Sequence, residues 1–343
     1  MSRRAPDPDG PWRLTLVADP DDCNLACDMC ECGRARADGP PSRPPRRLDP
    51  ALALAAFASA RSGGALREVV PSTLGEPLLW AGTDSLLDAC AAAGLRLNLT
   101  TNGTWPGRGA RAWGERLYPL ASDVKVSWNG ASAATAEAIM PGLDFAAAVA
   151  GVAEVAAARD AAAARSGVRG RLSFQVTAQA GNVDELPAMA RLAASLGVDR
   201  VKVNQLQPRA PHLLARALTR TRQGLERWNG AAAALRAAAT SLRTSAGVPL
   251  ELQGAGDLAL DPAAPAPLGP CPFVGREAWL LHDGRLAPCP HPAAWRGELG
   301  DFGRVGAAPL LELWRGPALA EFTRRHEEHP VCAACPFRRP GGA

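Results

Sequence analysis

The sequence predicts an α/β protein with a parallel β-sheet, followed by a small domain that carries cysteines. Strand-like and helical runs alternate from residue 13 to about residue 206. Strand–helix alternation is typical of parallel strands joined by helical crossovers. Eight of the nine cysteines lie near the two ends of the chain, four in each group. The six strand candidates are fewer than the eight strands of a closed barrel.

Each strand candidate is a short apolar or alternating run. The candidates lie at 13–17, 68–72, 95–101, 123–127, 171–177 and 200–204. The helical runs between them lie at 50–62, 84–93, 131–140, 145–164 and 183–196. Residues 208–246 are also predicted to be helical, and 254–270 is a Gly/Pro/Ala-rich linker. We therefore expect three regions: a partial barrel over 1–210, a helical segment and linker over 211–270, and a small domain over 271–343.

The later strand candidates alternate between apolar and polar side chains. Val124 and Val126 alternate with Lys125 and Ser127, for example. A parallel sheet covered on both faces usually has continuous apolar runs. An antiparallel sheet with one wet face would also alternate, but the interleaved helices argue against it. We therefore expect the sheet to curve around a polar cavity, with its apolar face toward the helices.

Composition narrows the class of protein. The 343 residues carry a net charge of +4 and are 47% hydrophobic, as in a globular chain. No stretch combines basic and aromatic residues as a nucleic-acid surface would. The sequence contains no apolar run of the roughly 18 residues needed to span a bilayer and no evident signal peptide, so we expect a cytoplasmic protein without a membrane partner. In that compartment, nine cysteines point to metal or redox chemistry more than to disulfides.

The strongest motif is Cys23-Asn-Leu-Ala-Cys27-Asp-Met-Cys30, in the loop after the first strand candidate. Open α/β sheets bind their ligands at this carboxyl edge. Three thiolates can hold three irons of a four-iron cluster and leave the fourth open. A zinc site normally has four protein ligands. Three unrelated loop cysteines remain the structural alternative.

This motif and three further segments together resemble the radical SAM superfamily. Leu74-Gly75-Glu76-Pro77 is similar to its GGEP motif with the first Gly replaced, Thr101-Asn102-Gly103 to its TNG segment, and Ser127-Trp128-Asn129-Gly130 to its S-x-D-G with Asn for Asp. Met29 stands where the family often has an aromatic residue. The resemblance implies a partial (β/α)6 TIM-like barrel. It also implies contacts to S-adenosylmethionine (SAM) from Met29, Gly75, Glu76, Thr101, Asn102, Ser127 and Asn129.

The chemistry implied by the resemblance is reductive cleavage of SAM. The family's cluster chelates SAM through its open iron and releases a 5′-deoxyadenosyl radical, which abstracts hydrogen from an unactivated carbon. An external one-electron reductant of the flavodoxin or ferredoxin type is then expected as a partner.

A second group of cysteines lies in the last quarter of the chain. Cys271, Cys289, Cys332 and Cys335 are spaced CX17C, CX42C and CX2C. On its own this pattern would also suit a four-cysteine zinc site. It resembles the SPASM/twitch domains of radical SAM enzymes, and four cysteines imply one auxiliary [4Fe–4S] cluster. The expected cofactors are therefore two [4Fe–4S] clusters and SAM.

Two thiols and two histidines fall outside both groups. Cys90 lies on an apolar helical stripe and is expected in the core. Cys32 either faces the cavity or is an idle loop thiol. We interpret His282 and His291, which flank Cys289, as residues of a hairpin and not as ligands.

The substrate class follows from the resemblance alone. Only 22 residues precede Cys23, so a peptide-recognition domain of the kind found in many peptide-modifying relatives is not expected, although a separate chain can supply one. The four-cysteine pattern is similar to that of aminocyclitol and aminoglycoside dehydrogenases such as 2-deoxy-scyllo-inosamine dehydrogenase. These enzymes oxidise a secondary alcohol to a ketone in antibiotic biosynthesis, with the auxiliary cluster as electron acceptor. Epimerisation using Cys32 as hydrogen donor, peptide maturation and a zinc protein without redox chemistry are the alternatives.

The two lysines of the chain, Lys125 and Lys202, both fall on the predicted polar face. Chance survival in an arginine-rich sequence would explain them equally well. Lysine can, however, act as a base where arginine cannot. We predict Lys202 as the catalytic base with Gln175, Asn204 and Gln205 toward the substrate, and Lys125 nearer SAM or deeper in the barrel.

Overall fold

The computed structural model describes residues 5–30, 33, 45–71, 74–208, 210–244, 247–263 and 269–338. The chain divides by contact into two compact units, which are considered separately. Unit 1 comprises Met1–Asp22, Pro45–Leu97 and Pro265–Ala343. Unit 2 comprises Cys23–Pro44 and Asn98–Ala264. The domain boundaries near 210 and 270 stay a prediction.

The six predicted strands are all present. They are β1 (Arg13–Leu16), β2 (Glu68–Val70), β3 (Arg96–Thr101), β4 (Ala121–Ser127), β5 (Arg171–Ala178) and β6 (Arg200–Gln205). Three short strands were not predicted: β7 (Glu251–Gln253), β8 (Glu277–Leu280) and β9 (Leu286–Ala287).

The helices agree with the sequence prediction over most of the chain. The α-helices are α2 (Pro50–Ser62), α3 (Thr83–Ala93), α4 (Gly109–Leu117), α5 (Ala133–Ile139), α6 (Phe145–Ser166), α7 (Leu186–Ser195), α8 (Arg222–Ala239), α9 (Pro292–Trp295), α10 (Leu310–Arg315), α11 (Pro317–Arg325) and α12 (Pro330–Ala333). The prediction missed α4, whose glycine-rich start gives little helical signal, and it gave no helices for the C-terminal region, where α9 to α12 lie. Of the helices described, none has the length and apolar character needed to cross a bilayer.

The C-terminal segment contributes a strand beside the first strand of the chain. Within unit 1, β1 pairs in parallel with β2 on one side and with β8 on the other, and β9 pairs antiparallel with β8. Arg13 on β1 bridges the two neighbours, with its guanidinium 2.5 Å from Glu68 and 2.7 Å from Glu277. The cysteine-bearing segment therefore shares a sheet with the first strands.

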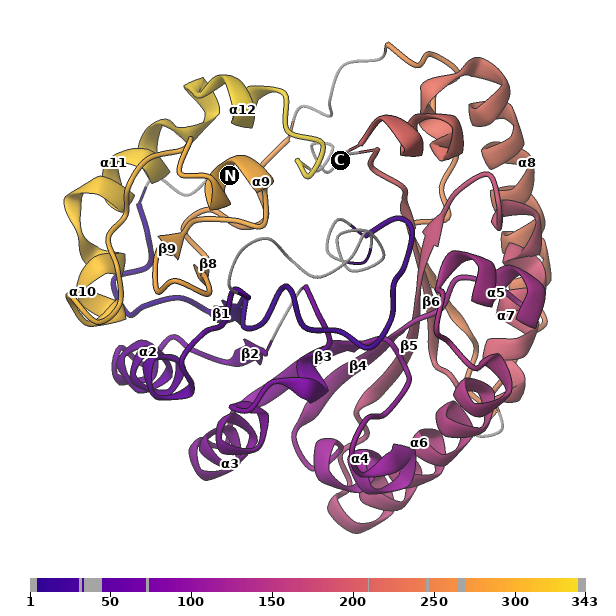
Figure 1. The fold of residues 1–343 in the computed structure, drawn as a ribbon, viewed down its shortest axis with the longest axis horizontal. Helices are drawn as coiled ribbons and strands as arrows, with labels where there is room; N and C mark the ends of the chain where they lie inside the picture. Colours follow the sequence, from indigo (N-terminus) through magenta and orange to yellow (C-terminus); the bar gives the residue numbers. More distant parts are fainter. Residues whose placement is uncertain are drawn as a thin grey trace. The chain divides into compact units, whose positions relative to one another are not determined.

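In unit 2, β4, β5, β6 and β7 pair in parallel in that order. The predicted alternation is observed: Val124, Val126 and Phe174 are fully buried, whereas Lys125, Ser127 and Gln175 are partly exposed. Helices α6, α7 and α8 lie along one side of these strands (Figure 1). The apolar face is the buried one, and the other face remains polar.

The strand register arranges this polar face in layers. One layer places Ser127 beside Gln175 and Gln175 beside Lys202. The layer nearer the amino ends of the strands places Lys125 beside Ser173 and Ser173 beside Arg200. Lys202 therefore lies one layer nearer the carboxyl edge than Lys125.

A buried charged group closes the amino end of the polar face. The Asp123 carboxylate, 5% exposed, pairs with Arg200 and accepts a hydrogen bond from Ser173 Oγ at 2.7 Å. Buried charges are tolerated when paired in this way. The open, less buried end of the face is thus the carboxyl edge, where parallel sheets bind ligands.

The prediction of helix throughout 208–246 is wrong in its first part. Two 3₁₀ turns, Pro211–Arg216 and Leu218–Arg220, come before α8. Thr221 begins α8 because its side chain accepts a hydrogen bond from the Gly224 amide. The start of the predicted linker is also fixed to α8, since Trp228 Nε1 donates to the Gly256 carbonyl at 3.0 Å.

Candidate functional site

The loop of the first three cysteines is held against the segment that follows α5. Leu25 is 2% exposed and packs with Ile139 and Met140. The Ala26 amide donates to the Pro141 carbonyl at 3.0 Å, and the Asp28 amide donates to the Ile139 carbonyl at 3.3 Å. The backbone between Cys23 and Cys30 is therefore fixed at several points by residues far away in the sequence.

The thiols of this loop are partly exposed. Cys23, Cys27 and Cys30 are all of intermediate burial, and the Cys30 amide donates to the Cys27 carbonyl at 3.1 Å in a tight turn. Gly33 lies against the loop, because a Cβ there would clash with the Cys27 carbonyl oxygen. Sequence analysis missed Gly33, although a glycine so soon after the last cysteine is a local signal for close backbone approach.

Asn102 connects the predicted TNG segment to the cysteine loop. Its Nδ2 donates to Cys23 Sγ at 3.5 Å and to Asn24 Oδ1 at 2.8 Å, and its Oδ1 accepts from the Thr104 amide at 2.9 Å. A donor aimed at sulfur favours the thiolate, the form that binds iron. Asn102 thus positions the first cysteine, and its predicted contact with SAM stays a prediction.

In unit 1, Gly75 and Glu76 lie against the chain that leads to Cys23. The Glu76 amide donates to the Asp22 carbonyl at 2.8 Å, and the buried Glu76 carboxylate accepts from the Leu78 amide at 3.2 Å. Gly75 has a φ of +70°, and a Cβ there would clash with the Asp19 carbonyl oxygen. The glycine therefore permits the close approach of two backbone segments.

Replacing Gly75 by Ala is expected to destabilise the protein more than replacing Gly94 by Ala. Gly94 has a similar φ of +65° but open space around its Cα. The free energy of unfolding of its Ala variant should therefore fall by only about 1–2 kcal/mol, the cost of a left-handed backbone at a residue with a Cβ. The Gly75 variant adds an overpacking cost of about 1–3 kcal/mol. Urea unfolding of both variants, with iron content after reconstitution, measures the difference. Equal losses would show that the contact with Asp19 is unimportant.

Four other predicted SAM contacts lie in unit 2. Met29 Sδ accepts from Gln179 Nε2 at 3.7 Å, and Ser127 ends β4 beside Gln175. Thr101 and Asn129 are buried, at 1% and 2% exposure. Asn129 Oδ1 accepts from the Thr177 amide at 2.9 Å. The Asn129 side chain therefore supports the end of β5, and the contact of these four residues with SAM stays a prediction.

Two of the three predicted substrate residues, Gln175 and Asn204, lie on the carboxyl half of the polar face, whereas Gln205 has the strand parity of the buried face. Gln175 and Lys202 are register neighbours, and Asn204 pairs with Thr177 one layer higher. Gln205 follows at the strand end, with a buried side-chain oxygen that has no hydrogen-bond partner in the described structure. Cys32 lies outside the described residues.

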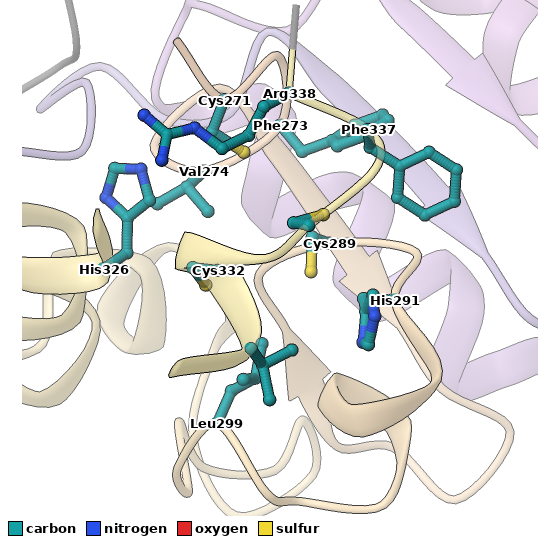
Figure 2. A pocket seen from close by; sticks show the side chains of 12 residues that line it. Cys271, Phe273, Val274, Cys289, His291, Leu299, His326, Cys332, Phe337 and Arg338 are labelled. Carbon is teal, nitrogen blue, oxygen red and sulfur yellow. The ribbon is translucent and has the colours of Figure 1, made fainter. Parts of the chain in front are cut away.

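The second group of cysteines lines a single cavity. Cys271, Cys289, Cys332 and Cys335 come from three segments of the C-terminal region and line the same pocket. Figure 2 shows three of them, Cys271, Cys289 and Cys332, around this pocket, with His326 and His291 on opposite sides in this view. The remaining lining is mostly apolar, including Phe273, Val274, Leu299 and Phe337.

Burial disfavours the thiolate form of three of the cysteines in this cavity. Burial raises the pKa of Cys332 to about 12 and raises the pKa of Cys271 and Cys289. Backbone amides of Phe273 and Val274 oppose this shift at Cys271 by hydrogen bonding to its sulfur. A bound cation deprotonates such thiols outright. Four thiols that line one mostly apolar cavity suit a fully ligated cluster with one cysteine on each iron.

Cys90 behaves differently from both groups. It is fully buried in α3, and burial raises its pKa to about 12. The expectation of a core thiol is therefore confirmed.

Among the described residues, no three His, Cys, Asp or Glu side chains are placed so that they could hold a single metal ion.

Comparison with known protein families supports the grouping of the four C-terminal cysteines in one domain. Residues 271–336 match the SPASM family, an iron–sulfur cluster-binding domain. The matched segment contains all four C-terminal cysteines. This segment is therefore similar to an iron–sulfur cluster-binding domain. No curated protein sequence matches the chain significantly.

The fold of the chain is similar to that of SuiB from Streptococcus suis. The SAM-bound crystal structure of SuiB aligns with 98% of this chain and 73% of that chain, at 15% identity and a TM-score of 0.65. SuiB bound to the precursor peptide SuiA aligns with 96% and 70%, at 13% identity and a TM-score of 0.62. BtrN in complex with AdoMet and 2-DOIA aligns with 95% and 91%, at 12% identity, but its TM-score of 0.42 is too low to establish a shared fold.

These findings confirm the predicted fold class. The chain has an α/β fold with parallel strands that is similar to the fold of SuiB, and residues 271–336 match the SPASM family. The predicted cofactors, [4Fe–4S] clusters and SAM, agree with the family match and with the SAM-bound neighbour.

Proposed function

We propose that the chain is a radical SAM oxidoreductase that oxidises a secondary alcohol of an aminocyclitol- or aminoglycoside-type sugar to a ketone, as a step in antibiotic biosynthesis. Cys23, Cys27 and Cys30 hold the cluster that binds SAM, and the four C-terminal cysteines hold the auxiliary cluster. The observation that carries the proposal is the single cavity that all four of those cysteines line. One fully ligated auxiliary cluster suits a two-electron oxidation, because it can take up an electron without binding substrate.

The cofactors and the protein divide the chemistry between them. When bound, the cofactors supply a 5′-deoxyadenosyl radical that takes a hydrogen atom from the carbinol carbon, and an acceptor for the second electron. The protein must orient the sugar and remove the hydroxyl proton. Lys202 lies beside Gln175, in the layer of the polar face nearer the carboxyl edge. We assign the proton to Lys202 Nζ and the orientation of the sugar to Gln175, Asn204 and Gln205.

A peptide substrate is the second candidate. It is supported by the similarity in fold to SuiB, whose structure was determined with the precursor peptide SuiA.

Epimerisation of an aminocyclitol- or aminoglycoside-type sugar is a further alternative. It would return a hydrogen atom to the carbinol carbon, and Cys32 is the thiol that we assign to that step.

The proposal is tested by product analysis with the reconstituted protein, SAM and dithionite. We expect aminocyclitols, and not peptides, to stimulate 5′-deoxyadenosine release and to yield a product lighter by two hydrogens. Lys202→Met should lower product formation at least roughly tenfold while leaving iron content unchanged, and Lys125→Met should have the smaller effect.

Other results of the same experiment would favour one of the alternatives or exclude a role for Lys202. Stimulation by peptides alone would favour the peptide candidate. An epimerised product that carries solvent deuterium, lost in Cys32→Ala, would favour epimerisation. Unchanged turnover in Lys202→Met would remove Lys202 from the proposed mechanism.

A further inference from the structure

Arg338 borders the cavity of the four C-terminal cysteines. Its side chain is only 13% exposed and its guanidinium lies 3.7 Å from the Glu327 carboxylate. Its Nε donates to the Gly269 carbonyl at 2.5 Å, and its backbone amide donates to the Cys335 carbonyl at 3.3 Å. The guanidinium is thus fixed by residues that precede Cys271 and Cys332 in the chain, and Figure 2 shows Arg338 at the rim of the cavity near Cys271.

The Arg338 side chain lines the same cavity as Cys271 and Cys332. Among the described residues that line the cavity, Arg338 is the one Lys or Arg side chain. Its carboxylate partner Glu327 is 46% exposed, so solvent screens the opposing charge more than it screens the guanidinium.

A charge held at this place affects electron uptake. Reduction adds one negative charge to an iron–sulfur cluster, and burial in an apolar cavity disfavours that charge. A fixed positive charge in a low-dielectric surrounding stabilises the reduced form and raises the reduction potential. Net charge and hydrogen bonding around the sulfurs are the properties with which proteins adjust this potential.

We propose that Arg338 raises the reduction potential of the cluster in this cavity, so that the cluster can accept the electron released when the substrate is oxidised. In this proposal Arg338 acts only through its charge on the cluster and has no contact with the substrate. The inference rests on the proposed function, because it requires an electron-accepting cluster bound by Cys271, Cys289, Cys332 and Cys335.

The test is redox titration followed by electron paramagnetic resonance. It uses the full chain with Cys23, Cys27 and Cys30 replaced by Ala, so that only the C-terminal cluster contributes. In this background Arg338→Gln should lower the equilibrium constant for reduction at least tenfold, which is about 59 mV for one electron. Arg338→Lys should retain most of the potential, because it keeps the charge.

Two further variants keep the test decisive. Glu327→Gln removes the opposing charge and should raise the potential, by less than Arg338→Gln lowers it. Arg324→Gln, on the exposed face of α11 where Arg324 is 51% exposed, should leave the potential unchanged. If Arg338→Gln prevents cluster assembly, Glu327→Gln still decides the matter by the direction of its shift.

The possible failures are distinguishable. A cluster that assembles but has the same potential in wild type, Arg338→Gln and Glu327→Gln would overturn the role of Arg338 alone. Absence of iron from the C-terminal site in the background protein would overturn the proposed function, and the role of Arg338 with it.

Discussion

Replacing Cys23, Cys27 and Cys30 together by Ala should reduce the iron content from about eight to about four atoms per chain and abolish SAM cleavage. The three thiols lie in one loop that Leu25, Ala26 and Asp28 fix against the segment after α5. Without them no iron is open to chelate SAM. The measurements are iron and sulfide analysis after anaerobic reconstitution, and 5′-deoxyadenosine release in the presence of dithionite.

Cys90→Ala is the matched control for this variant. Cys90 is fully buried in α3, so its loss removes a thiol without touching either cysteine group. Iron content and SAM cleavage should both be retained. A triple variant that still releases 5′-deoxyadenosine at the wild-type rate would contradict the assignment of the SAM cluster to this loop.

The second large effect is expected at the C-terminal cavity. Replacing Cys332 and Cys335 by Ala removes two of the four thiols that surround it, so about four irons should remain. SAM cleavage should persist, because the loop of Cys23 to Cys30 is unchanged. Formation of the ketone should be abolished, because the second electron has no acceptor. Cleavage and product are measured in the same reaction.

Folding of the segment that matches the SPASM family must be verified separately. Cys332 and Cys335 are both partly exposed, so their substitution leaves the buried core of the unit intact, and near-ultraviolet circular dichroism should retain the wild-type spectrum. Undiminished ketone formation by the folded variant would disprove the proposed role of the auxiliary cluster. A C-terminal site filled with zinc in the wild-type protein would disprove the cluster itself.

Local patterns predicted much of the fold and supplied the candidate metal ligands. Alternation of side chains in β4, β5 and β6 is a property of each strand alone, because successive residues of a strand point to opposite faces. The polar face with Lys125 and Lys202 could therefore be predicted before any pairing was known. The spacing of Cys23, Cys27 and Cys30 is equally local, since one short loop contains all three.

Tertiary structure alone decided how these local pieces meet. Arg13 binds Glu277, 264 residues away, and β8 lies beside β1, but neither contact leaves a periodic signal in the sequence. Asn102 against Cys23 and Arg338 beside Cys271 are further examples. The sequence by itself determined which residues are candidate iron ligands and which strand faces are polar, because both follow from residue type and backbone period. Which side chains adjust the cysteines depends on packing between distant segments, and only the folded chain brings those segments together.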